Sequence, residues 1–248
     1  MPPKKVVRQR GLQCPFNSSQ YISICLHLLT TAIFIAFVAV GAISDATTLL
    51  LSIIIFTSLT TFIVSAWIFT SYVDSSVAPS NGCERCFCGM LYCFKRAQLK
   101  TRYCAVSKKK VPGMDHYCVW MNTAIGARNY PGFFLVALLS TLLLWFQIII
   151  SIVGLMSAKA TTMIITFSVV QLLCSIGVAS PYTTLLFFHL YLICKQTSTF
   201  DYLMNQAKLK AKKRKAAIND TNKPKVGGTE KINENTNPTQ TTTYEEAA

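Results

Sequence analysis

An aspartate, a histidine and a cysteine lie within four residues of one another in the sequence Asp115-His116-Tyr117-Cys118. A cysteine attacks as its thiolate, and a free thiol has a pKa of about 8.5. A neighbouring histidine can take the thiol proton and hold the thiolate in an ion pair, and a carboxylate can orient that imidazole. The three residue types therefore suit nucleophilic thiol chemistry. Residue types alone leave a second interpretation open, in which the cluster is purely structural.

Long apolar segments flank this cluster on both sides. The chain has 248 residues, of which 52% are hydrophobic and 14% are charged, whereas an average soluble domain has about 25% charged residues. Four segments without Lys, Arg, Asp or Glu reach the roughly 20 residues that a membrane-spanning helix needs. They are residues 21–43, 49–71, 133–156 and 162–194. We therefore predict an all-α integral membrane protein with four transmembrane helices.

The fourth apolar segment is longer than one span requires. We expect it to tilt, to kink at Pro181, or to extend past the membrane surface. We expect His189, near the end of this segment, to form a local hydrogen bond or to contact a lipid headgroup. We expect the same of His27, within the first span.

Basic residues predict the orientation of the spans. Of the 24 Lys and Arg residues, 4 precede the first span, 9 lie between the second and third, and 10 follow the fourth, while Lys159 alone lies in a short connection. The positive-inside rule then places both termini and the long connection in the cytosol. The formal net charge of +14 is explained by this rule, so the lipid bilayer is the expected partner and nucleic acid is not.

The predicted chain has five parts. These are a cytosolic N-terminal tail over 1–20, spans over 21–71, a compact, loop-rich, cysteine-containing cytosolic domain over 72–132, spans over 133–194, and a basic and disordered cytosolic tail over 195–248. The basic run over 208–215 predicts either a helix on anionic lipid headgroups or a solvated topology signal. The composition of residues 219–248 predicts disorder.

The sequence around the reactive cluster resembles the DHHC family of protein S-acyltransferases, also called palmitoyltransferases. Those proteins have four spans and a cysteine-rich domain between the second and third. Here the Asp-His-His-Cys motif has Tyr117 at its third place and Val119 where proline is usual. Further positions agree with the family pattern after the motif and after the fourth span: Trp120, Gly126, Asn129, Phe133, Ser198, Thr199 and Asp201. The first asparagine of that pattern falls on Thr123.

This resemblance implies a reaction and a role for each member of the cluster. Cys118 is expected to accept an acyl group from a long-chain acyl-CoA such as palmitoyl-CoA as a thioester, with His116 as general base and Asp115 orienting His116. A cysteine thiol of a protein substrate then takes the acyl group at the cytosolic membrane face. Basic side chains of the loop are candidates for the phosphates of CoA: Arg96, Lys100, Lys108, Lys109 and Lys110.

Zinc is the point at which this chain departs from the family pattern. The family holds two zinc ions through six cysteines and two histidines, and those places map here to Met90, Cys93, Tyr103, Cys104, Ser107, Lys110, Tyr117 and Ala124. Two ligands are too few, because a structural zinc site needs four. We therefore expect no bound cofactor, with hydrogen bonds and apolar contacts replacing the metal and with Met90, Tyr103 and Tyr117 filling its volume.

The remaining cysteines leave alternatives open. Cytosolic thiols stay reduced, so disulfides are not expected. Cys83, Cys86, Cys93 and Cys104 have the residue types for one improvised zinc site, whereas juxtamembrane cysteines are also common sites of acylation. Two rival functions accompany these alternatives: a catalytically dead scaffold or regulator of the same fold, and a four-span structural protein with an acylated cysteine-rich loop. The family resemblance places the protein in the endoplasmic reticulum, the Golgi or the plasma membrane.

Overall fold

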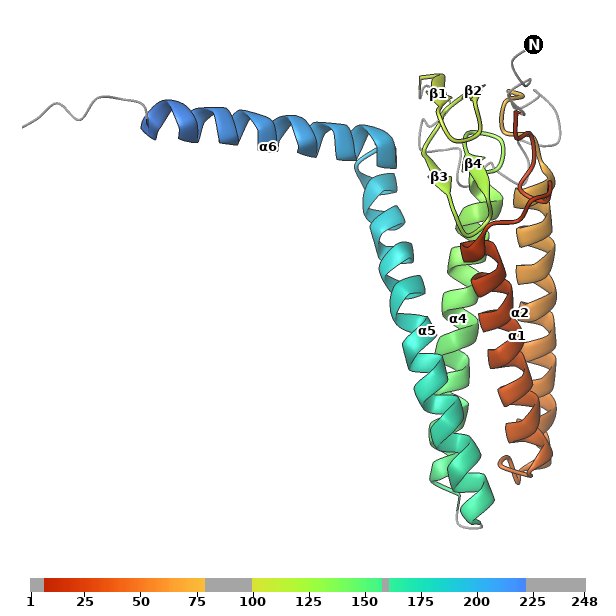
Figure 1. Ribbon diagram of the computed structural model, residues 1–248. Coiled ribbons are helices and arrows are strands. Elements are labelled where there is room, and N and C mark those ends of the chain that lie inside the picture. Colours follow the sequence, from red (N-terminus) through yellow and green to blue (C-terminus); the bar gives the residue numbers. More distant parts are fainter. Residues whose placement is uncertain (1–6, 79–99, 158–160, 222–248) are drawn as a thin grey trace, which may run out of the picture. The chain divides into compact units, whose positions relative to one another are not determined.

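Four long helices dominate the computed structural model, which describes residues 7–78, 100–157 and 161–221 (Figure 1). They are α1 (Ser18–Ala39), α2 (Ala46–Tyr72), α4 (Tyr130–Leu155) and α5 (Thr162–Cys194). Each is long and apolar enough to cross a bilayer. The four predicted spans are thus confirmed, with shifts of a few residues at their ends.

Side-chain caps begin three of these helices. Asn17, Asp45 and Thr161 each accept a hydrogen bond from a backbone N–H in the first turn of α1, α2 and α5 respectively. Such caps satisfy donors that the helix itself leaves open. Helix α4 begins instead with a proline in its first turn, where the missing N–H costs no helical hydrogen bond.

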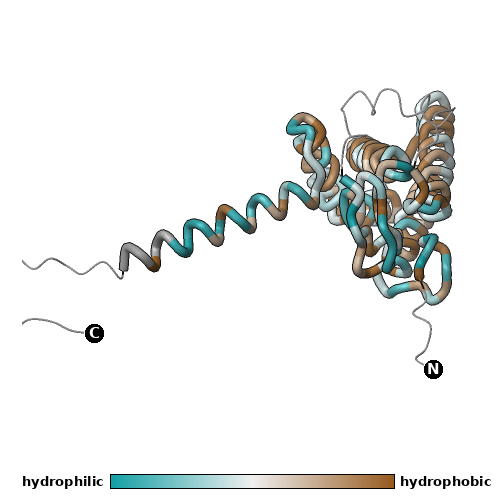
Figure 2. The backbone as a smooth tube through the Cα atoms, turned by 90° about the horizontal axis from the view of Figure 1, so that it is seen from above, coloured by the Kyte–Doolittle hydropathy of each residue, from teal (hydrophilic) through white to brown (hydrophobic). Residues whose placement is uncertain are grey.

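Helix α4 is the centre of the bundle. It packs against α5 and α2, and α1 packs against α5. A second apolar cluster joins α1 to α2, where the rings of Phe34 and Phe56 stack with centroids 4.1 Å apart. The colouring by hydropathy shows hydrophobic residues throughout these bundle helices (Figure 2).

Helix α5 continues through Pro181. Its 33 residues correspond to about 50 Å at 1.5 Å per residue, which exceeds the roughly 30 Å of a bilayer's hydrocarbon core. The last turns of α5 therefore have the length to reach the residues between α2 and α4.

Two short antiparallel hairpins form the described part of the segment between α2 and α4, and we call residues 100–129 the interhelical domain (Figure 1). Strand β1 (Arg102–Cys104) pairs with β2 (Lys109–Val111), and β3 (His116–Cys118) pairs with β4 (Thr123–Ile125). Each turn contains a residue with positive φ, Lys108 at 55° and Asn122 at 53°. Residues 79–99 lie outside the described part of the chain.

Helix α6 (Thr199–Thr221) follows α5. The chain divides into two compact units, Met1–Gln206 and Ala207–Ala248, and the first turns of α6 belong to the first unit. The basic run, for which we expected either a helix on lipid headgroups or a solvated topology signal, lies in α6, and hydrophilic residues predominate along this helix (Figure 2). The predicted disorder began at residue 219, but residues 219–221 are helical. Residues 222–248 lie outside the described part.

Candidate active site

Strand β3 presents the reactive residues on one face. Side chains alternate along a strand, so His116 and Cys118 point to the same side and Tyr117 points to the other. Cys118 is buried, with 6% of its surface exposed, in an apolar cluster that includes Phe133 of α4 and Leu186 of α5. The four-residue motif therefore places its histidine and cysteine side by side against the helical bundle.

Asp115 is held by the start of α6 and by strand β4 of its own hairpin. Its carboxylate accepts the backbone N–H of Thr199 at 3.1 Å and the Thr199 hydroxyl at 2.7 Å. Its backbone carbonyl accepts the N–H of Phe200 at 3.0 Å, and its own N–H donates to Ile125 at 2.8 Å. Helix α6 thus begins on the carboxylate that was predicted to orient the histidine.

His116 contacts both of its predicted partners. Its Nδ1 lies 2.8 Å from Asp115 Oδ2, and Cys118 is close enough to contribute to the pKa of the imidazole. Burial of the imidazole favours its neutral form, but the hydrogen bonds and charges of Asp115 and Cys118 outweigh burial and raise the pKa of His116 to about 9. These contacts therefore favour the protonated form of the imidazole.

His189 of α5 lies beside His116. It is 2% exposed, and its ring centroid lies 5.7 Å from that of His116. Phe133 packs edge-on against both imidazoles at 4.9 Å. The predicted local hydrogen bond exists, because Nδ1 of His189 lies 3.0 Å from the Tyr130 hydroxyl. Its proximity to the reactive cluster was not predicted, because only the fold brings α5 there.

A second local hydrogen bond was predicted for His27 of α1, and it is confirmed. Its Nε2 lies 2.8 Å from the hydroxyl of Tyr182 of α5. This contact joins α1 to α5 within the bundle.

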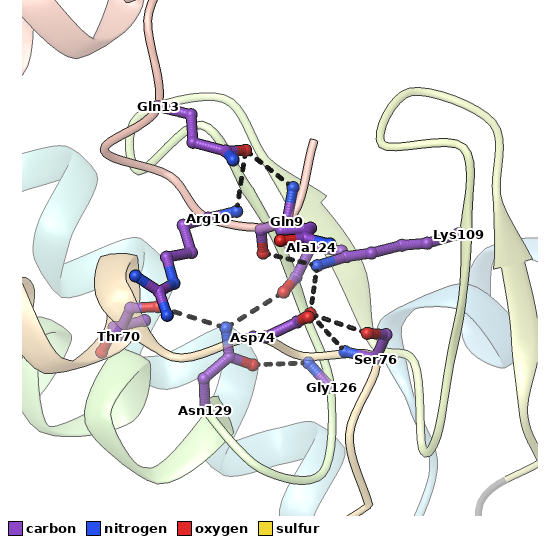
Figure 3. Close-up of polar contacts among 10 residues, drawn as sticks. All are labelled: Gln9, Arg10, Gln13, Thr70, Asp74, Ser76, Lys109, Ala124, Gly126 and Asn129. Carbon is purple, nitrogen blue, oxygen red and sulfur yellow. Dashed lines mark hydrogen bonds and ion pairs between the residues drawn. The ribbon is translucent and has the colours of Figure 1, made fainter. Parts of the chain in front are cut away.

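Two motif residues shape the backbone that supports β4 (Figure 3). Asn129 is fully buried; its amide donates to the carbonyls of Thr70 and Ala124, and its oxygen accepts the N–H of Gly126 at 2.9 Å. A Cβ on Gly126 would lie 2.5 Å from Val111 Cγ1, so the close approach of the two hairpins requires glycine. These residues tie the interhelical domain to the end of α2.

The other motif residues divide between the site and the surface. Ser198 is buried and shares hydrogen bonds with Asp201, and Asp201 forms an ion pair with Arg102 of β1. Phe133 lies against His116, as described above. Trp120, by contrast, is 49% exposed and lies at the surface of the described part of the chain.

The chain matches one known protein family. The family model described as DHHC palmitoyltransferase matches residues 81–206, which include the reactive cluster, α4, α5 and the start of α6. The chain belongs to the DHHC palmitoyltransferase family.

Individual members of the DHHC palmitoyltransferase family share part of their length with this chain. Probable protein S-acyltransferase 15 of Arabidopsis thaliana is 28% identical over 137 residues, which are 54% of this chain and 51% of the relative. Probable protein S-acyltransferase 2 of the same plant is 34% identical over 125 residues, 48% of this chain and 28% of the relative. Palmitoyltransferase pfa3 of Emericella nidulans is 32% identical over 77 residues, 31% of this chain and 14% of the relative. The match thus spans about half of the first relative and less than a third of the other two.

Two of the mapped zinc-ligand places, Cys104 and Ala124, belong to a small apolar core in this member of the family. Cys104, Val111, Met114 and Ala124 are buried together, and Tyr117 packs against them. Ser107 is also buried. One thiol among alanine, tyrosine and serine does not make a tetrahedral zinc site, so these residues do not fit the metal. Met90 and the alternative ligands Cys83, Cys86 and Cys93 lie outside the described residues.

Of the two described tyrosines that were predicted to fill the volume of the missing zinc, only Tyr117 packs against the apolar core. Burial raises the pKa of Tyr117. Tyr103 was predicted to fill the same space, but it is 61% exposed. Alternation along β1 explains the error, because Cys104 is the strand's buried residue and its neighbour faces outward.

Ligand atoms of Asp115, His116 and His189 lie within 4.8 Å of one another, which makes this cluster a second possible metal site. The carboxylate of Asp115 already receives hydrogen bonds from Thr199 and His116. The hydrogen bonds to Asp115 therefore account for this geometry without a metal.

Lys109 was among the residues predicted to contact CoA phosphates, and the structure assigns it another partner. Its ammonium lies 2.8 Å from Asp74 Oδ1, and only 6% of its side chain is exposed (Figure 3). Burial alone would raise the pKa of Asp74, but Lys109 and Ser76 outweigh burial and lower it. Lys100, Lys108 and Lys110 remain exposed.

Proposed function

We propose that this member of the DHHC family is a protein S-acyltransferase that uses a long-chain acyl-CoA, such as palmitoyl-CoA. The observation that supports this most strongly is the placement of buried Cys118 on the same strand face as His116, whose Nδ1 contacts Asp115, while Thr199 in turn holds Asp115. Family membership supports the same activity.

The reaction has two steps through one thioester. The Cys118 thiolate, paired with the His116 imidazolium, attacks the carbonyl carbon of the acyl-CoA thioester. The bond between that carbon and the CoA sulfur breaks, and the CoA thiolate takes a proton from His116. A cysteine thiol of a protein substrate then gives its proton to His116 and attacks the new thioester, which returns the thiolate to Cys118.

The surroundings of Cys118 favour an acyl chain that enters from the membrane. Cys118 packs with apolar side chains of α2, α4 and α5. An acyl chain that follows these helices stays in an apolar environment while its carbonyl stands at the polar boundary. The protein then mainly orients the two thioesters and excludes water, which accounts for much of the rate in such exchanges.

The basic residues define the membrane side on which this chemistry takes place. We infer that both termini and the interhelical domain face the cytosol, where acyl-CoA and substrate thiols are available. Lys108 and Lys110, both exposed at the β1–β2 turn, remain candidates for the CoA phosphates. The family resemblance favours the endoplasmic reticulum, the Golgi or the plasma membrane.

The two rival functions make different predictions in one experiment. Purified protein is incubated with palmitoyl-CoA labelled in its acyl chain, and hydroxylamine-labile label on the protein is measured. We expect Cys118→Ser to remove the label and Cys194→Ser, at an exposed cysteine, to leave it unchanged. Label that survives Cys118→Ser undiminished would support the structural protein with an acylated loop.

Transfer separates the enzyme from the dead scaffold. After labelling, excess palmitoyl-CoA is removed and a peptide with a membrane-proximal cysteine is added. We expect the label to leave Cys118 and to appear on the peptide cysteine. Label that stays on Cys118 while the peptide remains unlabelled would favour the scaffold or regulator.

A further inference from the structure

The N-terminal segment crosses the same end of the molecule as the reactive strand (Figure 1). We call residues 8–20 the N-terminal strap. We propose that this strap positions Cys118 in place of zinc, because it binds the backbone and side chains on both sides of the nucleophile. The proposal rests on the proposed function, because it concerns the site to which we assign acyl transfer.

Asn122, in the turn between β3 and β4, is the meeting point of these contacts. Its Oδ1 accepts the Tyr117 hydroxyl at 2.7 Å and the Asn17 amide at 3.3 Å, and its own amide donates to Gln20 Oε1 at 3.2 Å. Asn122 is 4% exposed and has φ of 53°, a conformation that asparagine tolerates better than most residues. Tyr117, at a zinc-ligand place of the family, therefore bonds to a turn that the strap holds.

Asn17 holds the other neighbour of the nucleophile. Its amide donates to the carbonyl of Val119 at 2.8 Å, while its Oδ1 caps α1 by accepting the N–H of Gln20 at 2.7 Å. The residue that begins the first spanning helix is thus also bonded beside Cys118. One side chain couples the bundle to the reactive strand.

Backbone contacts anchor the strap to the bundle. The N–H of Gly11 donates to Ser71 of α2 at 2.7 Å, and the Gly11 carbonyl accepts the Gln20 amide at 3.3 Å. A Cβ on Gly11 would lie 2.2 Å from the Met121 carbonyl oxygen. The strap backbone therefore packs directly on the turn that follows Cys118.

A second anchor joins the strap to the first hairpin (Figure 3). Lys109 of β2 donates to the carbonyl of Gln9 at 2.7 Å and pairs with Asp74 beyond the end of α2. The guanidinium of Arg10 lies 4.1 Å from the ring centroid of Tyr72, within the range of a cation–π contact. Both hairpins are thus tied to one segment, which is the structural role that zinc serves in a metal-bound domain.

The test uses exposure of Cys118 as its readout, because a buried thiol reacts with a maleimide only when the surrounding structure opens. Purified full-length protein in detergent is treated with N-ethylmaleimide, and modification of the Cys118 peptide is followed by mass spectrometry. Asn17→Asp keeps the cap on α1 but loses the amide donor, and Tyr117→Phe loses one hydroxyl. We expect each to speed modification by about threefold to tenfold. Gly11→Ala, which displaces the strap, is expected to have the largest effect.

Matched variants control for the chemical change itself. Tyr103→Phe removes an exposed hydroxyl in the same domain, and Gly177→Ala adds a methyl group where nothing lies within 4 Å. Both should leave the modification rate within about twofold. The helical melting temperature, followed by circular dichroism, should be unchanged in Asn17→Asp and Tyr117→Phe, which distinguishes local opening from unfolding.

A kinetic readout distinguishes positioning from general stability. At saturating palmitoyl-CoA, acylation of Cys118 should slow in the strap variants, while the half-saturating palmitoyl-CoA concentration stays within about twofold. If the rate of Cys118 modification is unchanged in Asn17→Asp, Tyr117→Phe and Gly11→Ala, the strap proposal is overturned, even when the native protein is acylated normally. Failure of the native protein to acquire label would instead overturn the proposed function, and the maleimide measurement would still decide the role of the strap.

Discussion

The two faces of strand β3 differ in what they share with the DHHC family. On the face toward the bundle, His116 and Cys118 meet Phe133 and His189, and the adjacent Asp115 meets Thr199. On the opposite face, Tyr117 packs on an apolar core where the family places zinc ligands. The first face keeps the residues to which we assign the reaction, whereas the second keeps an apolar core and hydrogen bonds in place of ligands.

This difference teaches which requirements of the site are chemical and which are mechanical. A nucleophile and its base must have defined residue types, because proton transfer depends on pKa and geometry. A scaffold must only keep the strand in place, and a satisfied polar network with an apolar core can do so as well as a metal. The predictions below test whether the two faces are separable in this way.

The largest difference is expected between substitutions of adjacent residues on opposite faces. His116→Ala removes the proton acceptor, so self-acylation of Cys118 should slow by about 10²-fold to 10⁴-fold. Tyr117→His changes the scaffold face and should slow it by less than about tenfold. Single-turnover acylation with labelled palmitoyl-CoA measures both. Equal losses would show that the two faces are not separable.

A smaller effect is expected from the contact between α6 and the reactive cluster. Thr199→Val keeps the shape of the side chain but removes the hydroxyl that donates to Asp115 at 2.7 Å. Because hydrogen bonds to charged groups contribute about 1.5–3 kcal/mol, acylation should slow by roughly tenfold or more. Thr184→Val is the matched control, since that hydroxyl bonds within its own helix. A rate equal to that of the control would remove α6 from the site.

His189 tests how far the chemical face extends into the bundle. His189→Gln replaces the imidazole beside His116 with an amide, and we expect acylation to slow by about threefold to tenfold through altered packing and hydrogen bonding. Tyr130→Phe, which removes the hydroxyl that contacts His189, should have a smaller effect of about twofold. If Tyr130→Phe slowed the reaction more than His189→Gln, the tyrosine rather than the histidine would belong to the site.

The pH dependence of stability should report the same face with the smallest effect. The folded-state pKa of His116 is raised from 6.5 to about 9, so its contribution to folding is fully present below pH 6.5 and is lost as pH rises through about 9. Unfolding in detergent at pH 6.5 and at pH 9.5 should show a loss of about 1–3 kcal/mol in the native protein. His116→Gln should lack that component, and an identical pH dependence in both proteins would contradict the charged imidazole.

The sequence predicted the spans and the reactive cluster because both signals are local. Uninterrupted apolar segments define α1, α2, α4 and α5 to within a few residues, and Asp115, His116 and Cys118 are neighbours in the chain. The strands have only three residues each, so their alternating pattern is too short to be recognised in the sequence. The folded hairpins nevertheless pack Tyr117 against the apolar core and leave Tyr103 exposed.

The contacts that the sequence did not predict come from distant segments. His189 lies on a helix whose apolar composition says nothing of its partner, and its place beside His116 depends on the packing of α5. The N-terminal strap is a polar segment with no periodic pattern, so only the folded chain shows Asn17 beside Val119. Lys109 was assigned to phosphates by charge alone, whereas burial against Asp74 decides its role.

One measurement tests most directly whether the chemical face works on a metal-free scaffold. The zinc content of the purified chain is determined on the same sample in which acylation of Cys118 by palmitoyl-CoA is quantified. We predict stoichiometric thioester on Cys118 with zinc far below one ion per chain, and a rate that a chelator does not change. Zinc at one or two ions per chain, lost together with acylation when a chelator is added, would contradict this.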